Sequence, residues 1–66
     1  MIYNEGDKVV SDFTPDYGQG IIKLVYPDKS MLVYWPNIKE KYPTSYCIYR
    51  YYEKEFNQFK KVVDII

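Results

Sequence analysis

Five tyrosines and one arginine lie within residues 42–52, and their side chains suit non-covalent binding better than bond-making chemistry. They are Tyr42, Tyr46, Tyr49, Arg50, Tyr51 and Tyr52. A tyrosine offers a large contact area and a polar tip, and it loses little rotamer freedom at an interface. Tyrosine together with arginine is the usual composition of binding hot spots. This segment, with the neighbouring loop over residues 36–43 and its Lys39 and Lys41, therefore predicts a surface that binds a protein partner.

Two other interpretations of this aromatic segment stay open. In the first, residues 45–52 form a strand with aromatic side chains on both faces, which the C-terminal tail partly covers. In the second, the rings stack on the bases of a nucleic acid, and Arg50, Lys39 and Lys41 contact its phosphates. The second interpretation corresponds to a nucleic-acid-associated domain involved in transcription or in DNA or RNA binding.

The charge balance favours a protein partner over a nucleic acid. Nine basic and nine acidic residues cancel, so no overall field attracts phosphate. A basic patch on one face would reverse this preference. The lysines that could form such a patch are Lys39, Lys41, Lys54, Lys60 and Lys61.

The residue types that catalysis and metal binding need are scarce in this chain. It has no histidine and one cysteine, so Cys47 lacks the base that usually activates a thiol. We interpret Cys47 as a small buried hydrophobic residue of a strand. No acidic pair has the spacing of a catalytic motif, and no cluster of potential ligands has the spacing of a metal site. We therefore predict no enzyme activity, no metal ion and no cofactor.

The length and composition indicate one small domain that spans residues 1–66. Hydrophobic residues make up 47% of the chain and aromatic residues 20%, so a core rich in aromatic side chains can stabilise a domain of this size. No apolar run is long enough to span a bilayer, and the first residues lack the basic start and apolar stretch of a signal peptide. A single cysteine cannot form an intramolecular disulfide, which indicates a reducing compartment. We expect a cytoplasmic protein.

The balance of residue types also gives a hypothesis about the source of the chain. It has no alanine and eight lysines against the single Arg50. This composition is typical of coding by an AT-rich genome, such as that of a low-GC bacterium or its phage. The corresponding hypothesis is a phage-encoded modulator or inhibitor of a host protein.

Short apolar runs separated by turn residues predict the elements that position these side chains. Gly18 and Gly20 predict a turn that needs positive φ angles or a close backbone approach. Residues 27–30 predict a compact hairpin connection, and residues 37–44 an exposed loop. The expected antiparallel strands cover residues 8–12, 21–26, 31–35 and 45–52.

The pattern of apolar residues predicts which side chains form the core. In the fourth strand, alternation places Tyr49 on one face and Arg50 on the other. In the tail, apolar residues from Tyr52 to Ile66 fit a helical stripe, but a short helical turn over residues 53–59 followed by a closing strand over residues 60–66 is favoured. The expected core residues are Val9, Ile22, Leu24, Val33, Trp35, Ile48 and Phe59.

Three segments together resemble the small SH3-like barrels, the Tudor, KOW and related groups built from five short, strongly bent strands. The segments are Gly6–Val10, Tyr17–Ile22 and Leu32–Trp35, and Glu55–Val62 resembles the one-turn helix and closing strand of these folds. The resemblance implies a mainly β, five-stranded barrel with a short helical turn near the C-terminus. It also implies a binding module that engages proteins, modified side chains or nucleic acid. The opening resembles the polymerase-interacting domain of CarD-type transcription regulators, whose basic DNA-binding part this chain lacks.

The resemblance adds a second candidate site and an expectation about assembly. Tyr17 and Trp35 lie where such folds place the walls of an aromatic cage for a methylated cation. Packing of Trp35 in the core is the competing interpretation. Because a small sheet with open edges and surplus aromatic residues tends to pair with another copy, we expect a homodimer.

Overall fold

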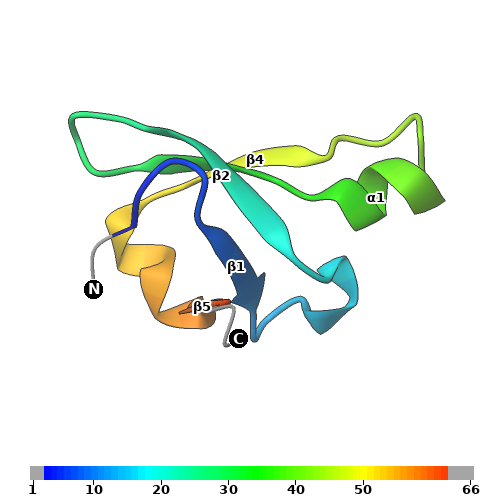
Figure 1. The fold of residues 1–66 in the computed structure, drawn as a ribbon, viewed down its shortest axis with the longest axis horizontal. Helices are drawn as coiled ribbons and strands as arrows, with labels where there is room; N and C mark the ends of the chain where they lie inside the picture. Colours follow the sequence, from blue (N-terminus) through cyan, green and yellow to red (C-terminus); the bar gives the residue numbers. More distant parts are fainter. Residues whose placement is uncertain (1–2, 63–66) are drawn as a thin grey trace.

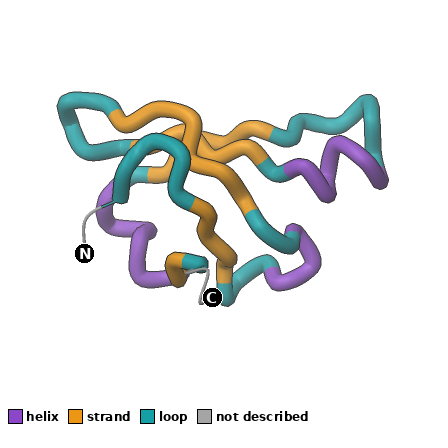
Figure 2. The backbone as a smooth tube through the Cα atoms, viewed as in Figure 1, coloured by secondary structure: helices purple, strands orange, loops and turns teal. Residues whose placement is uncertain are grey.

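A computed structural model describes residues 3–62, and these residues form one antiparallel sheet with short helical segments at its ends (Figures 1 and 2). The five strands lie in the order β4-β3-β2-β1-β5. Within the described residues, β4 and β5 are edge strands that do not pair with each other, so the sheet that these residues form is open and does not close into a barrel. The strands are β1 (Lys8–Ser11), β2 (Gly20–Val25), β3 (Met31–Tyr34), β4 (Ile48–Tyr51) and β5 (Phe59–Lys61).

The connection between β1 and β2 contains the 3₁₀ helix η1 (Pro15–Tyr17). Pro15 stands at its start, where a missing N–H costs nothing. Gly18 follows with a φ of 68°, a conformation that glycine adopts without strain. Glycine is needed at position 20 for a different reason, which is lack of space. An added Cβ would lie 2.5 Å from Val33 Cγ1 in the core. The predicted glycine turn is therefore confirmed, with close backbone approach at Gly20.

The hairpin between β2 and β3 forms as predicted, and its turn is closed by backbone bonds. The N–H of Lys29 donates to the carbonyl of Tyr26 at 2.9 Å, and the N–H of Tyr26 donates to the carbonyl of Ser30 at 2.8 Å. Lys29 takes a φ of 70°, the left-handed residue that often follows a type I turn in a hairpin. Asp28 accepts the N–H of Ser30 at 2.9 Å, which fixes the turn from its side chain.

The core lies on one face of the sheet and is centred on Trp35, which is fully buried. Five of the expected core residues are buried, but Leu24 is 45% exposed and Ile48 is 48% exposed. The register of β2 against β3 shifts between Ile22 and Leu24, which breaks the alternation that placed Leu24 inside. Ile48 lies on the outer face of β4. The buried hydrophobic residues are Val9, Ile22, Met31, Val33, Trp35, Ile38 and Phe59.

Residues 37–44 are not the exposed loop that the sequence predicted, because a short helix occupies their first half. Helix α1 (Pro36–Lys41) begins directly after β3, with Pro36 at its first position. Ile38 turns inward and is buried against the core. The N–H of Tyr42 donates to the carbonyl of Ile38 at 2.8 Å and ends the helix. Six residues are too few for a stable isolated helix, so its packing through Ile38 holds it in place.

The tail confirms the favoured interpretation of a helical turn and a strand, and the alternative of one continuous helix is wrong. The 3₁₀ helix η2 (Glu53–Gln58) leads directly into β5, which pairs with β1. Glu55 fixes the start of η2, because its carboxylate accepts the N–H of Tyr52 at 2.8 Å. The predicted strand residues 63–66 lie outside the described part of the chain.

Among residues 3–62, no helix has the length and apolar character that crossing a membrane requires.

Candidate functional site: a tyrosine-lined groove

A groove of ≈ 410 Å³ opens between η1, α1 and the start of β4, at the end of the molecule away from the β2–β3 turn (Figure 1). Four tyrosines line it, from η1, from the segment after α1 and from β4. They are Tyr17, Tyr42, Tyr46 and Tyr49. We call this feature the tyrosine groove. Three of the four belong to the aromatic segment that the sequence singled out, and the fold adds Tyr17 from a distant loop.

Tyr17 and Tyr49 form the inner wall of the tyrosine groove. The Tyr17 ring meets the edge of Trp35 with a centroid distance of 5.2 Å, so the core holds it in position. The Tyr49 ring stacks on Tyr17 at 6.4 Å with an angle of 10° between the ring planes. The Tyr49 ring is thus supported on one side by a residue that itself packs against the core.

Helix α1 forms the opposite side. Ile38 anchors it to the core while Asn37 and Lys41 face the groove. The Asn37 amide occupies the space where a side chain of residue 18 would lie, which explains why Gly18 lets η1 pack closely against α1. The same packing that positions Tyr17 therefore also positions α1.

Tyr42 and Tyr46 form the outer part of the groove and are the least buried of its tyrosines. Tyr42 is 62% exposed and Tyr46 is 83% exposed. The hydroxyl of Tyr49 donates to the carbonyl of Tyr46 at 3.4 Å, which ties the loop to β4. Burial of apolar surface is favourable in water. Among the groove tyrosines, these two rings therefore have the most surface left to bury.

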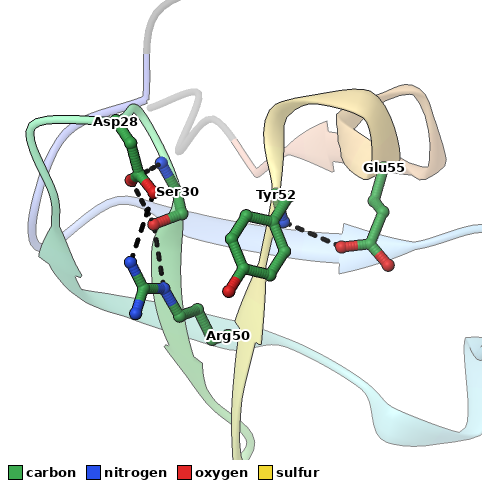
Figure 3. A network of polar contacts seen from close by, with 5 residues as sticks. All are labelled: Asp28, Ser30, Arg50, Tyr52 and Glu55. Atoms are coloured by element: carbon green, nitrogen blue, oxygen red, sulfur yellow. Dashed lines mark hydrogen bonds and ion pairs between the residues drawn. The ribbon is translucent and has the colours of Figure 1, made fainter.

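Arg50 does not belong to the groove, although the sequence placed it in the same site. Because side chains alternate along β4, Arg50 lies on the face opposite Tyr49. Its guanidinium lies beside Ser30 and Asp28 (Figure 3). Nε donates to the buried hydroxyl of Ser30 at 2.9 Å, and Nη2 pairs with Asp28 at 3.4 Å. The guanidinium carbon also lies 4.1 Å from the ring centroid of Tyr26 and 5.3 Å from that of Tyr52. Arg50 therefore contacts and stabilises the β2–β3 turn, and Tyr52 packs beside its guanidinium. Neither residue lines the tyrosine groove.

Hydrogen bonds from Ser30 favour the ionised form of Asp28, the carboxylate in the β2–β3 turn that Arg50 contacts. The Ser30 hydroxyl and the Ser30 N–H both donate to Asp28, and together with the nearby Arg50 charge they hold the pKa of this carboxyl below its usual value. The ionised form is thus favoured in the folded chain.

Tyr51, another member of the predicted site, points into the core. The indole Nε1 of Trp35 donates to its hydroxyl at 3.2 Å, and its ring meets that of Phe59 at 4.8 Å. Burial raises the pKa of Tyr51. Tyr51 therefore supports the fold rather than the binding surface.

Trp35 is fully buried, so its ring is not an open wall of an aromatic cage. The competing interpretation, packing in the core, is confirmed. Tyr17 contacts this ring and faces the tyrosine groove instead.

The lysines of the predicted basic patch are spread over α1, η2 and β5, and Lys54 is exposed on η2. Lys60 and Lys61 lie on edge strand β5, where they pair with Asp12 at 3.7 Å and with Asp7 at 3.2 Å. A hydrogen bond from the N–H of Asn4, followed by the pairing with Lys61, lowers the pKa of Asp7. Lys41 lines the tyrosine groove, and Lys39 is exposed on α1 without lining that groove.

The sequence singled out none of the polar groove residues Asp16, Asn37 and Ser45, although Asn37 and Ser45 fall within the predicted segments 36–43 and 42–52. It also missed the part that Ile38 plays below them. The prediction of a loop over residues 37–44 could not reveal these residues. It is the helix that brings Asn37 and Lys41 to the same side of the groove. The available signal was Pro36, which is favoured at the first position of a helix.

No family model matches the chain, and comparisons with curated proteins and with solved structures find no match either.

Proposed function

We propose that this protein is a non-enzymatic binding module that captures a short segment of a protein partner in the tyrosine groove. The observation that carries the proposal is the convergence of three tyrosines from residues 42–49 with Tyr17 from a distant loop on one cleft. Tyrosine is enriched at binding hot spots because its ring buries much area while its hydroxyl keeps a hydrogen bond.

The other lining residues support a peptide as the ligand. Asp16 and Lys41 contribute one charge of each sign, while Asn37 and Ser45 offer neutral hydrogen-bonding groups. Such a mixture suits the amides of a peptide together with one apolar or aromatic anchor side chain. The groove volume of ≈ 410 Å³ fits a few side chains rather than a whole protein surface.

We also propose that the fold is of the SH3-like group. The strand order supports this relation, because β1 lies between β2 and the last strand β5. A 3₁₀ helix directly before the last strand is a second common feature. A fold of the SH3-like group is compatible with a binding module. Because a fold does not determine a function, the binding function rests on the groove.

The distribution of charge supports a protein partner over a nucleic acid. Lys60 and Lys61 on β5 have carboxylate partners, and Lys41 lies on a different element, α1. A phosphate backbone is bound by unneutralised cations along one path. The further expectation, that the partner is a host protein met by a phage product, stays a prediction.

Selection from a displayed library of random peptides tests the proposal. Peptides selected on the wild-type protein are measured against Tyr46→Ala and Tyr52→Ala, which both remove an exposed tyrosine from the same stretch. We expect Tyr46→Ala to weaken peptide binding by about 1–3 kcal/mol and Tyr52→Ala to leave it unchanged. The reason is that Tyr46 lines the groove and Tyr52 does not.

Two results would contradict this function. One is a selection that enriches no peptide, or only peptides to which both variants bind normally. The other is tight binding of single-stranded DNA or RNA by the wild type, with affinity that falls steeply as salt rises. The second result would establish the nucleic-acid interpretation.

A further inference from the structure

Strand β4 is an open edge of the sheet, and each of its residues is exposed or half-buried. Among residues 3–62, it pairs with β3 on one side only. An edge strand of this kind presents unpaired N–H and carbonyl groups that can bind another strand.

The bonding pattern between β3 and β4 identifies the outward-facing groups. The N–H of Trp35 donates to the carbonyl of Cys47 at 2.8 Å, and Tyr49 opposes Val33 in the same register. Because bonded and non-bonded pairs alternate in an antiparallel ladder, Tyr49 directs its backbone groups toward β3. Ile48 and Arg50 direct theirs away from it, and no turn or side chain among residues 3–62 takes them up.

The two edges of the sheet differ in their protection. Edge strand β5 is three residues long and carries Lys60 and Lys61, and short length and lysine both discourage edge pairing. Strand β4 contains neither lysine nor proline. Its one charge, on Arg50, is already paired with Asp28. The β4 edge is therefore the open one.

We propose that two copies of the chain pair through antiparallel β4 strands, with the two-fold axis at Tyr49. In this register Ile48 of each copy lies opposite Arg50 of the partner subunit, and their outward N–H and carbonyl groups form four hydrogen bonds. The carboxylate of Glu55 already accepts the N–H of Tyr52, which ends the exposed edge on this side. The dimer rests on the edge of β4 and does not depend on what the tyrosine groove binds.

The side chains of β4 suit this register. Arg50 meets the apolar Ile48 rather than another cation, so the two-fold symmetry brings no like charges together. The two Tyr49 rings lie side by side across the axis, and each also stacks on Tyr17 of its own copy. Such a dimer joins the two tyrosine grooves at their inner walls.

Sedimentation equilibrium of the full chain, from low micromolar to millimolar concentration, tests the dimer with three variants. Ile48→Lys places a cation opposite Arg50 of the partner subunit, whereas Ile48→Glu places an anion there. Leu24→Lys is the matched control, because Leu24 is 45% exposed against 48% for Ile48 and lies on the inner strand β2.

We expect the wild type and Leu24→Lys to dimerise alike. Ile48→Lys raises the dissociation constant about tenfold or more, and Ile48→Glu keeps or tightens the dimer, because each change acts twice across the axis. The amide protons of Ile48 and Arg50 also exchange more slowly with solvent as the protein concentration rises.

A wild-type chain that stays monomeric throughout this range would overturn the proposal. Equal dimerisation of Ile48→Lys and Leu24→Lys would do so as well, because it would move the interface away from β4. Should Ile48→Lys fail to fold, the Ile48→Glu comparison and the exchange of the two amides decide the question.

Discussion

Tyr49 and Arg50 are neighbours in the chain, yet their side chains serve different faces of β4. Tyr49 stacks on Tyr17 in the groove, and Arg50 donates to Ser30 and pairs with Asp28 on the other side. The alternation of a strand requires this separation. The residue-level consequence is that one substitution should affect binding while the next affects stability.

Arg50→Ala should reduce the stability of the fold and leave peptide binding unchanged. The substitution leaves the buried Ser30 hydroxyl without the Nε donor. A hydrogen bond from a charged donor to such a group contributes about 1–2 kcal/mol. Urea unfolding measures the loss, and the selected peptides measure binding. Weaker peptide binding at unchanged stability would contradict the assignment of Arg50 to the turn.

Asp28 should make the stability of the chain sensitive to acid. Its folded pKa is lowered by the two bonds from Ser30 and by Arg50, so its contribution is present above the pKa of the unfolded chain and is lost as pH falls through the folded pKa. The melting temperature of Asp28→Asn should therefore lie below that of the wild type at neutral pH and approach it as pH falls below about 4. A difference between the two proteins that stays constant with pH would rule this out.

Gly20→Ala should destabilise the fold through overpacking. The new Cβ would lie 2.5 Å from Val33 Cγ1 and 2.8 Å from the Trp35 ring, both of which are fully buried. We expect a loss of about 1–3 kcal/mol in urea unfolding. Gln19→Ala, at the exposed neighbouring position, serves as the control and should change stability little. Equal stability of the two variants would contradict this prediction, because it would show that the core accommodates a Cβ at position 20.

At the scale of elements, α1 is the part of the fold that the groove depends on most directly. It has six residues, and Ile38 is the only one of them that is buried. Ile38→Ala should cost about 2–4 kcal/mol and should weaken peptide binding further than this loss alone explains, because α1 then no longer holds Asn37 in place. Lys39→Ala, on the exposed side of the same helix, is the control. Normal peptide binding by folded Ile38→Ala would show that the groove does not need the helix.

The elements also show where sequence reasoning reached its limit. Turn residues and apolar runs predicted the β2–β3 hairpin and the helical turn before β5, because these depend on local preferences. The exposure of Leu24 depends on a register shift in strand pairing, which no local pattern reports. Helix α1 depends on the packing of Ile38, and a six-residue helix carries too little periodicity to be recognised.

The candidate site was predicted in part for the same reasons. An excess of tyrosine over residues 42–52 is visible in the sequence, and three of its tyrosines do line the groove. The alternation of β4 already separated Tyr49 from Arg50 and could have removed Arg50 from the site. Tyr46 is different, because it lies before β4 in a loop whose path only the folded chain determines.

At the scale of the molecule, residues 3–62 share one core, and Trp35 lies at its centre. Its ring contacts Tyr17, Tyr51 and Phe59, so it joins the groove to both edges of the sheet. Trp35→Ala should cost about 3–5 kcal/mol, enough to unfold most of a domain of this size. Far-UV circular dichroism measures the loss, with Tyr46→Ala as a folded control. A Trp35→Ala chain that unfolds at the wild-type urea concentration would contradict a single core.

We propose that the tyrosine groove, and not the Arg50 face, is the binding surface of this molecule. Backbone amide shifts of the ¹⁵N-labelled protein, recorded during titration with a selected peptide, test it most directly. We expect the largest shifts at Tyr17, Asn37 and Tyr46, and we expect the amides of Tyr26 and Ser30 to stay nearly unchanged. Shifts concentrated at Tyr26, Ser30 and Arg50 would contradict it, because the peptide would then lie on the opposite face of the sheet.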